Sequence, residues 1–450
     1  MTIPSKHLLL IYNHYPPFGG NMVIRVTNLS RELPKHGWRI TALAGKKRHY
    51  WCYEPDILKT LPKEVEIVKA FSPDPSFFLK ERLLPYPRHL SSTKLPAPAL
   101  YSRLMRWLAY TFMFPDHFIG WIPFAYRKAV KLIKENNFDA MFSTSVPETN
   151  HIVAMLLKKK FPNLPWVADF RDFFVNRQFV TFTNPLMDKA AYYLERKFIS
   201  YADQVWGVTP GLVKELKDRY KKTEPEDKFI CLTNGYSKWE METFSSLPVN
   251  IRKTPDEFII AHTGNLLNTR RIEPFLEVWK KLMSRENKRP VRLVLLGEVD
   301  LLTQEYIKAN NLQDSISIVS RVPHDYSLRL QREADMLFHI ISPSPRAKSA
   351  LSTKISEYLY WRKPTLVLAP DDSDTARAFR KARVGKVFPL ENQASCYDYL
   401  VETIENPSIE PSGIPEEIEK YSWEQLGMRA DEYLCRLIIP EKNRKKHKRT

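Results

Sequence analysis

The sequence predicts an α/β protein of two domains, each built on a doubly wound parallel sheet with helices on both faces. Two observations lead to this prediction. The chain has 450 residues, of which 43% are hydrophobic, so it is too long for one core and apolar enough for two. Short apolar runs rich in Val, Ile, Leu and Phe also alternate with longer segments of helical period, and this alternation occurs twice.

Seven apolar runs in the first half are expected to be strands, with helical segments between them. The first helical segment carries Met22, Val26, Leu29 and Leu33 on one stripe and is expected to end near Gly37. Six runs in the second half have the same character. The expected strands cover residues 8–12, 39–44, 65–70, 140–144, 166–169, 204–208 and 230–233, and then 258–262, 291–296, 316–319, 336–340, 365–369 and 386–388.

These patterns set the expected boundaries of the domains. We expect an N-terminal domain over 1–240, a linker over 241–256, a C-terminal domain over 257–412, a terminal helix over 413–440 and a basic tail over 441–450. Ligands of open α/β sheets bind at the carboxyl ends of the strands. The two domains are therefore expected to face each other across a cleft that holds the active site.

The chain is strongly basic, with 69 Lys and Arg against 51 Asp and Glu and a net charge of +18. Such a balance implies an anionic partner: a nucleotide diphosphate, an acidic membrane surface or a nucleic acid. Six of the positive residues lie in the last ten, EKNRKKHKRT, a tail that could touch anionic lipid or simply keep the chain soluble. No nucleic-acid recognition fold accompanies the charge, so no nucleic-acid partner is expected.

The cysteines and the apolar stretches indicate a cytoplasmic protein. The four cysteines are scattered, which argues against a disulfide framework and against a zinc site. The apolar run that follows Lys6 is too short for a signal peptide, and the stretch from Leu104 to Tyr126 is interrupted by prolines. We expect no transmembrane segment and, at most, peripheral contact with the inner face of the membrane, through the aromatic and basic residues 82–121.

The segment from Thr353 to Pro364, TKISEYLYWRKP, carries the strongest candidate site. Ser352 or Thr353 can cap a helix that has Lys354 and Glu357 on one side of its first turn. The helix start offers N–H groups to a phosphate, Lys354 adds a positive charge, and the carboxylate of Glu357 can accept both ribose hydroxyls. The alternative is an ordinary solvated helix face.

The context of this segment resembles glycosyltransferase family four, the retaining enzymes of GT-B fold, in which a Glu-led helix ends seven residues later at a Pro. Glu357 and Pro364 keep that spacing. Six further segments resemble the family in the same order: YPPFGGNMVIRVTNLSREL, FPDHFIGWIPFAYRKAVKLIKENNFDAMFSTSVPETNHIVA, WVADFRDFFVN, ADQVWGVTPGLVKEL, CLTNGYS and HTGNLLNTRRIEPFLEVW.

The resemblance implies transfer of a hexose-type sugar from a nucleotide diphosphate donor, with retention, to a glycan or lipid-linked acceptor in bacterial surface polysaccharide or lipopolysaccharide biosynthesis. The nucleotide sugar is a co-substrate, and no other cofactor is implied. The sequence has no Asp-x-Asp before a strand end, so metal-independent transfer is expected.

In the first half the resemblance assigns Gly19 and Gly20 to a turn that lets the sugar and diphosphate approach the backbone. His151 matches the acceptor-side histidine, and a histidine satisfied in the core is the alternative. The charged group from Asp169 to Asp172 follows an apolar strand, where Asp172 could orient an acceptor. The alternative there is a structural Arg–Asp pair that holds the loop.

In the second half the resemblance assigns donor binding to the turn after the first strand and to a later loop. Gly264 ends the strand, Asn265 stands where many members have Arg, and Arg270 or Arg271 would neutralise the diphosphate. Backbone groups of Arg321 and Val322 would contact the base.

One departure from the family affects sugar recognition. Many members carry a first Glu eight residues before the second, and here that position is Ser349, with Arg346 or Lys348 as replacement phosphate contacts. Two alternatives to transfer stay open: a sugar-nucleotide epimerase of GT-B fold, and a non-catalytic relative that binds nucleotide sugars, the second motivated by Ser349 and the small number of glycines.

Overall fold

The computed structural model describes residues 6–46, 52–73, 114–175, 185–245, 254, 256–267, 272–286, 289–320, 322–341, 345–407 and 413–438. Contacts divide these residues into two compact units. The first unit contains the described residues up to 233 and those from 423 onward, and the second contains those from 234 to 422. The chain therefore leaves the first unit after Thr233 and returns to it at Trp423.

The first unit is built on a seven-stranded sheet in the order β3-β2-β1-β4-β5-β6-β7, and every pairing is parallel. Its strands are β1 (Lys6–Ile11), β2 (Trp38–Lys46), β3 (Val65–Phe71), β4 (Ala140–Thr144), β5 (Trp166–Phe170), β6 (Gln204–Gly207) and β7 (Phe229–Cys231). Its helices are α1 (Ile24–Glu32), α4 (Ile122–Glu135), α5 (Thr149–Lys160), α6 (Pro185–Tyr201), α7 (Pro210–Tyr220) and α16 (Trp423–Ile438).

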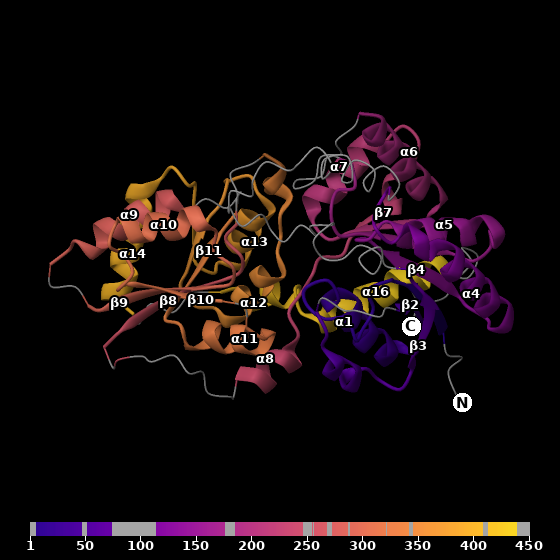
Figure 1. The fold of residues 1–450 in the computed structure, drawn as a ribbon, viewed down its shortest axis with the longest axis horizontal. Coiled ribbons are helices and arrows are strands. Elements are labelled where there is room, and N and C mark those ends of the chain that lie inside the picture. Colours follow the sequence, from indigo (N-terminus) through magenta and orange to yellow (C-terminus); the bar gives the residue numbers. More distant parts are fainter. Residues whose placement is uncertain are drawn as a thin grey trace. The chain divides into compact units, whose positions relative to one another are not determined.

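Both faces of this sheet are covered, which explains why its strands read as continuous apolar runs. Successive side chains of a strand point to opposite faces. In β1, Leu9 and Ile11 enter the core cluster under α4, α5, α6 and α7, while Leu8 and Leu10 enter the cluster under α1 and α16. Helices α1 and α16 lie side by side although they come from opposite ends of the chain (Figure 1).

The second unit repeats the design with a six-stranded sheet in the order β10-β9-β8-β11-β12-β13, again with parallel pairings. Its strands are β8 (Phe258–Thr263), β9 (Val291–Leu296), β10 (Ile316–Val319), β11 (Met336–Ile340), β12 (Thr365–Leu368) and β13 (Lys386–Phe388). Its helices are α8 (Lys238–Ser245), α9 (Glu273–Met283), α10 (Leu301–Ala309), α11 (His324–Glu333), α12 (Thr353–Trp361), α13 (Asp374–Ala382), α14 (Gln393–Glu405) and α15 (Pro415–Glu419).

The helices of the second unit divide between the two faces of its sheet. Residues of α9, α10 and α14 share one core cluster with Phe258 and Ile260 of β8. Residues of α8, α11, α12, α13 and α15 share the other cluster with Ile259 and Ala261. The second face carries the predicted donor-binding helix, α12.

The predicted fold class is confirmed, since both units are doubly wound parallel sheets. All thirteen expected strands coincide with strands of the described residues to within two residues at either end. The first helix also ends as predicted, through a 3₁₀ turn at Leu33–His36 and a left-handed Gly37 with φ of 83°.

Two segments differ from the expected organisation. Part of the expected linker forms α8, which packs against α11 in the second unit. The expected terminal helix over 413–440 is two helices: α15 belongs to the second unit, whereas α16 returns to the first and buries Trp423, Leu426 and Leu434 there. The expected tail, 441–450, lies outside the described residues.

Candidate donor-binding site

The candidate site is centred on the carboxylate of Glu357, a residue that is only 4% exposed. Gln331 Nε2 donates to its Oε2 atom at 2.7 Å, and Lys354 Nζ donates to the same oxygen at 3.2 Å. Burial by itself raises the pKa of Glu357, but the charges of Lys354 and His324 and these hydrogen bonds more than compensate, so the pKa lies below its ordinary value. The carboxylate is therefore ionised at neutral pH.

Lys354 connects this carboxylate to helix α11. Its ammonium group lies 3.1 Å from Ser327 Oγ and 3.5 Å from His324 Nδ1. The ring nitrogen that faces the ammonium group is thus Nδ1, and the other ring nitrogen of His324 is Nε2. That atom is 3.8 Å from Glu357 Oε1 and also 3.8 Å from Glu240 Oε2 in α8.

The two oxygens of Glu357 thus have different surroundings. Oε2 accepts two hydrogen bonds, whereas the contact recorded for Oε1 among the described residues is His324 Nε2 at 3.8 Å. A carboxylate oxygen has two acceptor positions. Oε1 is therefore the atom through which Glu357 can accept hydroxyl groups from a ligand.

The end of strand β8 is attached to the same network. Tyr358 accepts a hydrogen bond from the backbone N–H of Thr263 at 2.9 Å, and Gln331 Nε2 donates to Thr263 Oγ1 at 3.1 Å. Thr263 directly precedes Gly264. The predicted donor residues Lys354, Glu357 and Gly264 are consequently held on connected elements of one unit.

Gly264 and Asn265 form a close contact between the loops that follow β8 and β9. Gly264 has φ of 153°, and a Cβ atom added to Gly297 would lie 2.5 Å from the Gly264 carbonyl oxygen. Asn265 Oδ1 accepts the backbone N–H of Glu298 at 3.0 Å. The glycines are therefore needed for the approach of two loops, and Asn265 fixes one loop to the other.

Of the remaining predicted donor residues, the structure describes Val322 but not the three arginines. Val322 packs against the core cluster of this face, two residues before His324. Arg270, Arg271 and Arg321 lie outside the described residues, so their predicted roles are not tested by the structure.

Gly19 and Gly20 lie in the loop between β1 and α1 of the first unit, and a carboxylate is already beside them. Gly20 N–H donates to Glu54 Oε1 at 3.2 Å, and Gly19 N–H donates to the Cys52 carbonyl at 3.1 Å. A Cβ atom at Gly19 would lie 2.5 Å from Glu54 Cδ. The Glu54 side chain therefore lies directly against the glycine loop and accepts a hydrogen bond from it.

The group from Asp169 to Asp172 is largely structural, the alternative that the sequence left open. Arg25 Nε and Nη2 donate to the two carboxylate oxygens of Asp169 at 2.9 and 2.6 Å, and both residues are buried. Arg171 donates to the carbonyls of Asn21 and Met22 and so holds the glycine loop. Asp172 is exposed.

His151 is placed in the core of the first unit, not on its surface. The ring is fully buried and packs against Phe170 and Phe198, with centroids 4.9 and 5.4 Å away. Ser143 Oγ, which accepts from Trp166 Nε1, lies 2.8 Å from His151 Nδ1. The burial agrees with the alternative of a core histidine, although Nε2 has no hydrogen-bond partner among the described residues, and a contact of His151 with a donor sugar or acceptor stays a prediction.

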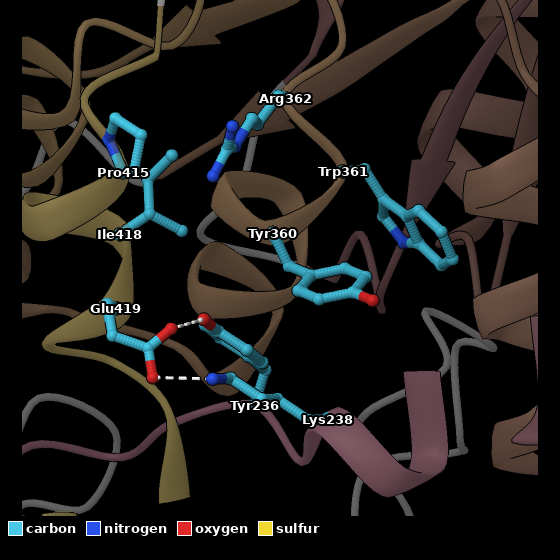
Figure 2. Close-up of a pocket in the computed structure, with 8 residues that line it drawn as sticks. All are labelled: Tyr236, Lys238, Tyr360, Trp361, Arg362, Pro415, Ile418 and Glu419. Atoms are coloured by element: carbon cyan, nitrogen blue, oxygen red, sulfur yellow. Dashed lines mark hydrogen bonds and ion pairs between the residues drawn. The ribbon is translucent and has the colours of Figure 1, made fainter. Parts of the chain in front are cut away.

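A concavity of the same unit lies at the other end of α12. It has a volume of about 420 Å³, and Figure 2 shows the Tyr236, Tyr360 and Trp361 rings along it, with Arg362 pointing inward. Glu419 accepts from Lys238 at 2.6 Å and from Tyr236 Oη at 3.4 Å on the opposite wall. This concavity was not predicted from the sequence.

Two further properties of the described residues are relevant to function. No described helix is long and apolar enough to cross a membrane. No three His, Cys, Asp or Glu side chains come together as potential metal ligands within the described part of the chain.

The structure adds residues that sequence reasoning missed, and one signal could have pointed to them. Ser327 and Gln331 lie one helical turn apart on the buried side of α11, together with Leu328 and Leu330. Polar side chains on the buried face of an amphipathic helix need partners inside the protein. Those partners, Lys354 and Glu357, come from α12.

Comparison with known proteins shows similarity in structure. No family model matches the chain, and no curated protein matches its sequence. Sucrose-phosphate synthase from Thermosynechococcus elongatus is similar over 96% of this chain and 99% of its own, with a TM-score of 0.60 at 13% identity. HepE of Anabaena in complex with UDP gives 0.58 at 11% identity over 96% and 99% of the two chains.

A third similar structure is a glycosyltransferase from Rickettsia africae, with a TM-score of 0.60 at 15% identity over 97% of this chain and 99% of the other. At such identities the likeness concerns the fold. The two parallel sheets, of seven and six strands, agree with this likeness. The chain accordingly has the two-unit α/β architecture of the GT-B fold.

Proposed function

We propose that the protein is a glycosyltransferase that moves a sugar from a nucleoside diphosphate donor to a glycan or lipid-linked acceptor, in bacterial surface polysaccharide or lipopolysaccharide biosynthesis. The observation that carries the proposal is the buried, ionised Glu357, whose Oε2 accepts two hydrogen bonds while the contact of Oε1 among the described residues is His324 Nε2 at 3.8 Å. A buried carboxylate in this state is suited to accept hydroxyl groups of a polar ligand. The complex of the similar HepE with UDP supports a nucleotide as that ligand.

In this proposal the second unit binds the donor. Glu357 Oε1 accepts ribose hydroxyls, and Lys354 exchanges its bond to Glu357 for a bond to the diphosphate. Arg270 and Arg271 supply further positive charge, and the backbone of Gly264, Asn265 and Val322 borders the nucleotide.

The first unit supplies the turn that approaches the sugar and diphosphate. The hydrogen bond from the Gly20 N–H to Glu54 Oε1 supports this role, since it directs a backbone donor of the loop at an oxygen. Asp172 is proposed to orient the acceptor from its exposed position at the end of β5.

The proposed transfer keeps the configuration of the sugar. The bond from the anomeric carbon to the diphosphate breaks, the acceptor oxygen bonds to that carbon on the same face, and the acceptor proton passes to the leaving phosphate. Positive groups around the diphosphate stabilise the charge that develops on it. No protein nucleophile is required, and we propose that no metal ion takes part.

Nucleotide binding is the direct test. The melting temperature is measured with UDP, GDP, ADP and CDP in turn. At least one of them is expected to raise it, since a ligand of the folded state stabilises that state. Glu357→Gln should lower the affinity for that nucleotide by about 10- to 100-fold, which is the contribution of a hydrogen bond to a charged group. Glu305→Gln, on the exposed side of α10, is the matched control and should change nothing.

The proposal would be abandoned if none of the four nucleotides stabilised the protein, or if Glu357→Gln bound as well as the wild type. Transfer to an acceptor in the presence of a chelator tests metal independence, and the anomeric configuration of the product tests retention.

Two other candidates are distinguished by what happens to the sugar, and Ser349 motivates the first of them, because it stands where a first Glu would contact the sugar. A non-catalytic relative would bind the nucleotide sugar and leave it intact with every acceptor. An epimerase would alter the sugar when no acceptor is present.

A further inference from the structure

The Gln331 side chain is a buried amide whose two ends have chemically different partners. It lies in α11 and is fully buried. Its Nε2 donates to Glu357 Oε2 at 2.7 Å and to Thr263 Oγ1 at 3.1 Å. Its Oε1 accepts from Trp361 Nε1 at 3.1 Å.

These partners determine the orientation of the amide. An indole N–H can only donate, so the group that faces Trp361 must be the amide oxygen. An ionised carboxylate can only accept, so the group that faces Glu357 must be the amide NH₂. A rotation of the amide by half a turn would break both bonds, and Trp361 therefore keeps Gln331 directed at Glu357.

Trp361 is well placed to hold this orientation. It follows Glu357 by four residues in α12, so the two side chains lie on the same side of the helix, one turn apart. The indole packs against Tyr360, with centroids 5.1 Å apart, and Tyr360 packs against Tyr236 at 5.0 Å. Figure 2 shows these three rings along the concavity at the end of α12.

We propose that Trp361 and Gln331 are positioning residues that set the selectivity of the site for ribose. Gln331 binds Oε2 of Glu357 and so fixes the plane of the carboxylate, which leaves Oε1 presented to the ligand. A ribose offers two adjacent hydroxyl donors to this oxygen, and a 2′-deoxyribose offers one fewer. The inference rests on the proposed role of Glu357 in nucleotide binding.

The experiment measures the affinities of UDP, GDP and ADP and of their 2′-deoxy analogues by calorimetry with the full-length protein. The wild type should prefer the ribonucleotide by about 10- to 100-fold, as expected for one hydrogen bond to a carboxylate. Trp361→Phe keeps an aromatic ring but removes the N–H, and it should lower this preference by about fivefold or more. Gln331→Glu, which removes the NH₂ group, should do the same.

A second tryptophan provides the control. Trp279 Nε1 donates to Ser315 Oγ at 3.0 Å in the core on the other face of the sheet. Trp279→Phe loses an equivalent hydrogen bond and should lower the melting temperature to a similar extent, yet leave the ribose preference unchanged. The ratio of affinities thus separates positioning from simple stability.

Each outcome decides the inference. If the wild type distinguishes the two sugars and Trp361→Phe distinguishes them equally well, the positioning role is wrong while the proposed function stands. If the wild type binds a nucleotide but does not distinguish the sugars, Glu357 does not read the ribose, and the inference is again wrong. If no nucleotide binds, the proposed function fails together with the inference.

Discussion

Two buried carboxylates, Asp169 in one unit and Glu357 in the other, differ in how their oxygens are engaged. In Asp169, both oxygens are engaged by Arg25, and Thr144 Oγ1 donates to one of them at 2.6 Å. In Glu357, Oε2 accepts two hydrogen bonds, whereas Oε1 lies 3.8 Å from His324 Nε2. Sequence reasoning identified Glu357 from its spacing to Pro364, but it could not decide whether the Asp169 group was structural, because Arg25 lies 144 positions away.

Asp169→Ala is expected to lower the free energy of unfolding by about 3–5 kcal/mol, because it leaves the buried Arg25 guanidinium without its charged partner. Denaturant unfolding measures this change. The double variant Arg25→Met with Asp169→Leu should recover much of the loss, since neither buried charge then remains. A loss below about 1 kcal/mol in the single variant would mean that the pair contributes little.

His151 is expected to make the stability depend on pH. Burial lowers its pKa to about 3, and the neighbouring Asp169 raises it only in part. The unfolded chain takes up a proton below the ordinary pKa of 6.5, whereas the folded protein does not until about 3, so stability falls as the pH falls through this window. At about pH 5 the loss is roughly 2 kcal/mol relative to neutral pH.

His151→Phe should remove this part of the pH dependence, because phenylalanine does not titrate. Denaturant unfolding of both proteins near neutral pH and near pH 5 supplies the comparison. Parallel pH profiles for the two proteins would show that the imidazole gains a proton in the folded state as easily as in the unfolded one. The sequence left this residue undecided, since helix α5 buries even its polar start, Thr149 to His151.

At the scale of elements, the strands were predictable and the destinations of two helices were not. A strand covered on both faces must be apolar throughout, so each appears as a short apolar run. Helix α8 is a short segment in which Met241 is buried and Trp239 exposed, and its stability comes from packing against α11. The apolar stripe of α16 indicates a buried face but carries no information on which of two sheets it covers.

Leu426→Ala and Leu434→Ala in α16 are each expected to cost about 2–5 kcal/mol, because both side chains are fully buried. The loss should appear in the unfolding of the first unit, where these residues pack. A nucleotide that binds the second unit should still raise the melting temperature of that unit in both variants.

Met428→Ala is the matched control on the same helix, since Met428 is 49% exposed and should tolerate the change. The assignment of α16 to the first unit would be wrong if the leucine variants lowered the melting temperature of the nucleotide-binding unit and left that of the first unit unchanged.

At the scale of the whole molecule, the charge of +18 suits anionic partners. We propose peripheral contact with the inner face of the membrane, to which the basic tail 441–450 and the aromatic and basic residues 82–121 would contribute. The tail and most of the second stretch lie outside the described residues, so this proposal depends on sequence and charge.

The protein is expected to sediment with vesicles that contain phosphatidylglycerol, but not with vesicles of phosphatidylcholine alone. The interaction should weaken at high salt, because added ions screen exposed charges. Deletion of residues 441–450 removes six positive residues and should weaken it as well. Equal sedimentation with both kinds of vesicle would argue against an electrostatic contact.

The path of the chain through the two units makes the second one an insertion. Its two ends meet, since Tyr236 N–H donates to the Tyr421 carbonyl at 2.9 Å, and the first unit keeps Leu232 and Trp423 in one core cluster. Residues 234–422 form one uninterrupted stretch of sequence. A gene fragment encoding this stretch could therefore be expressed by itself or exchanged as a cassette, while a short loop joining 233 to 423 would close the host.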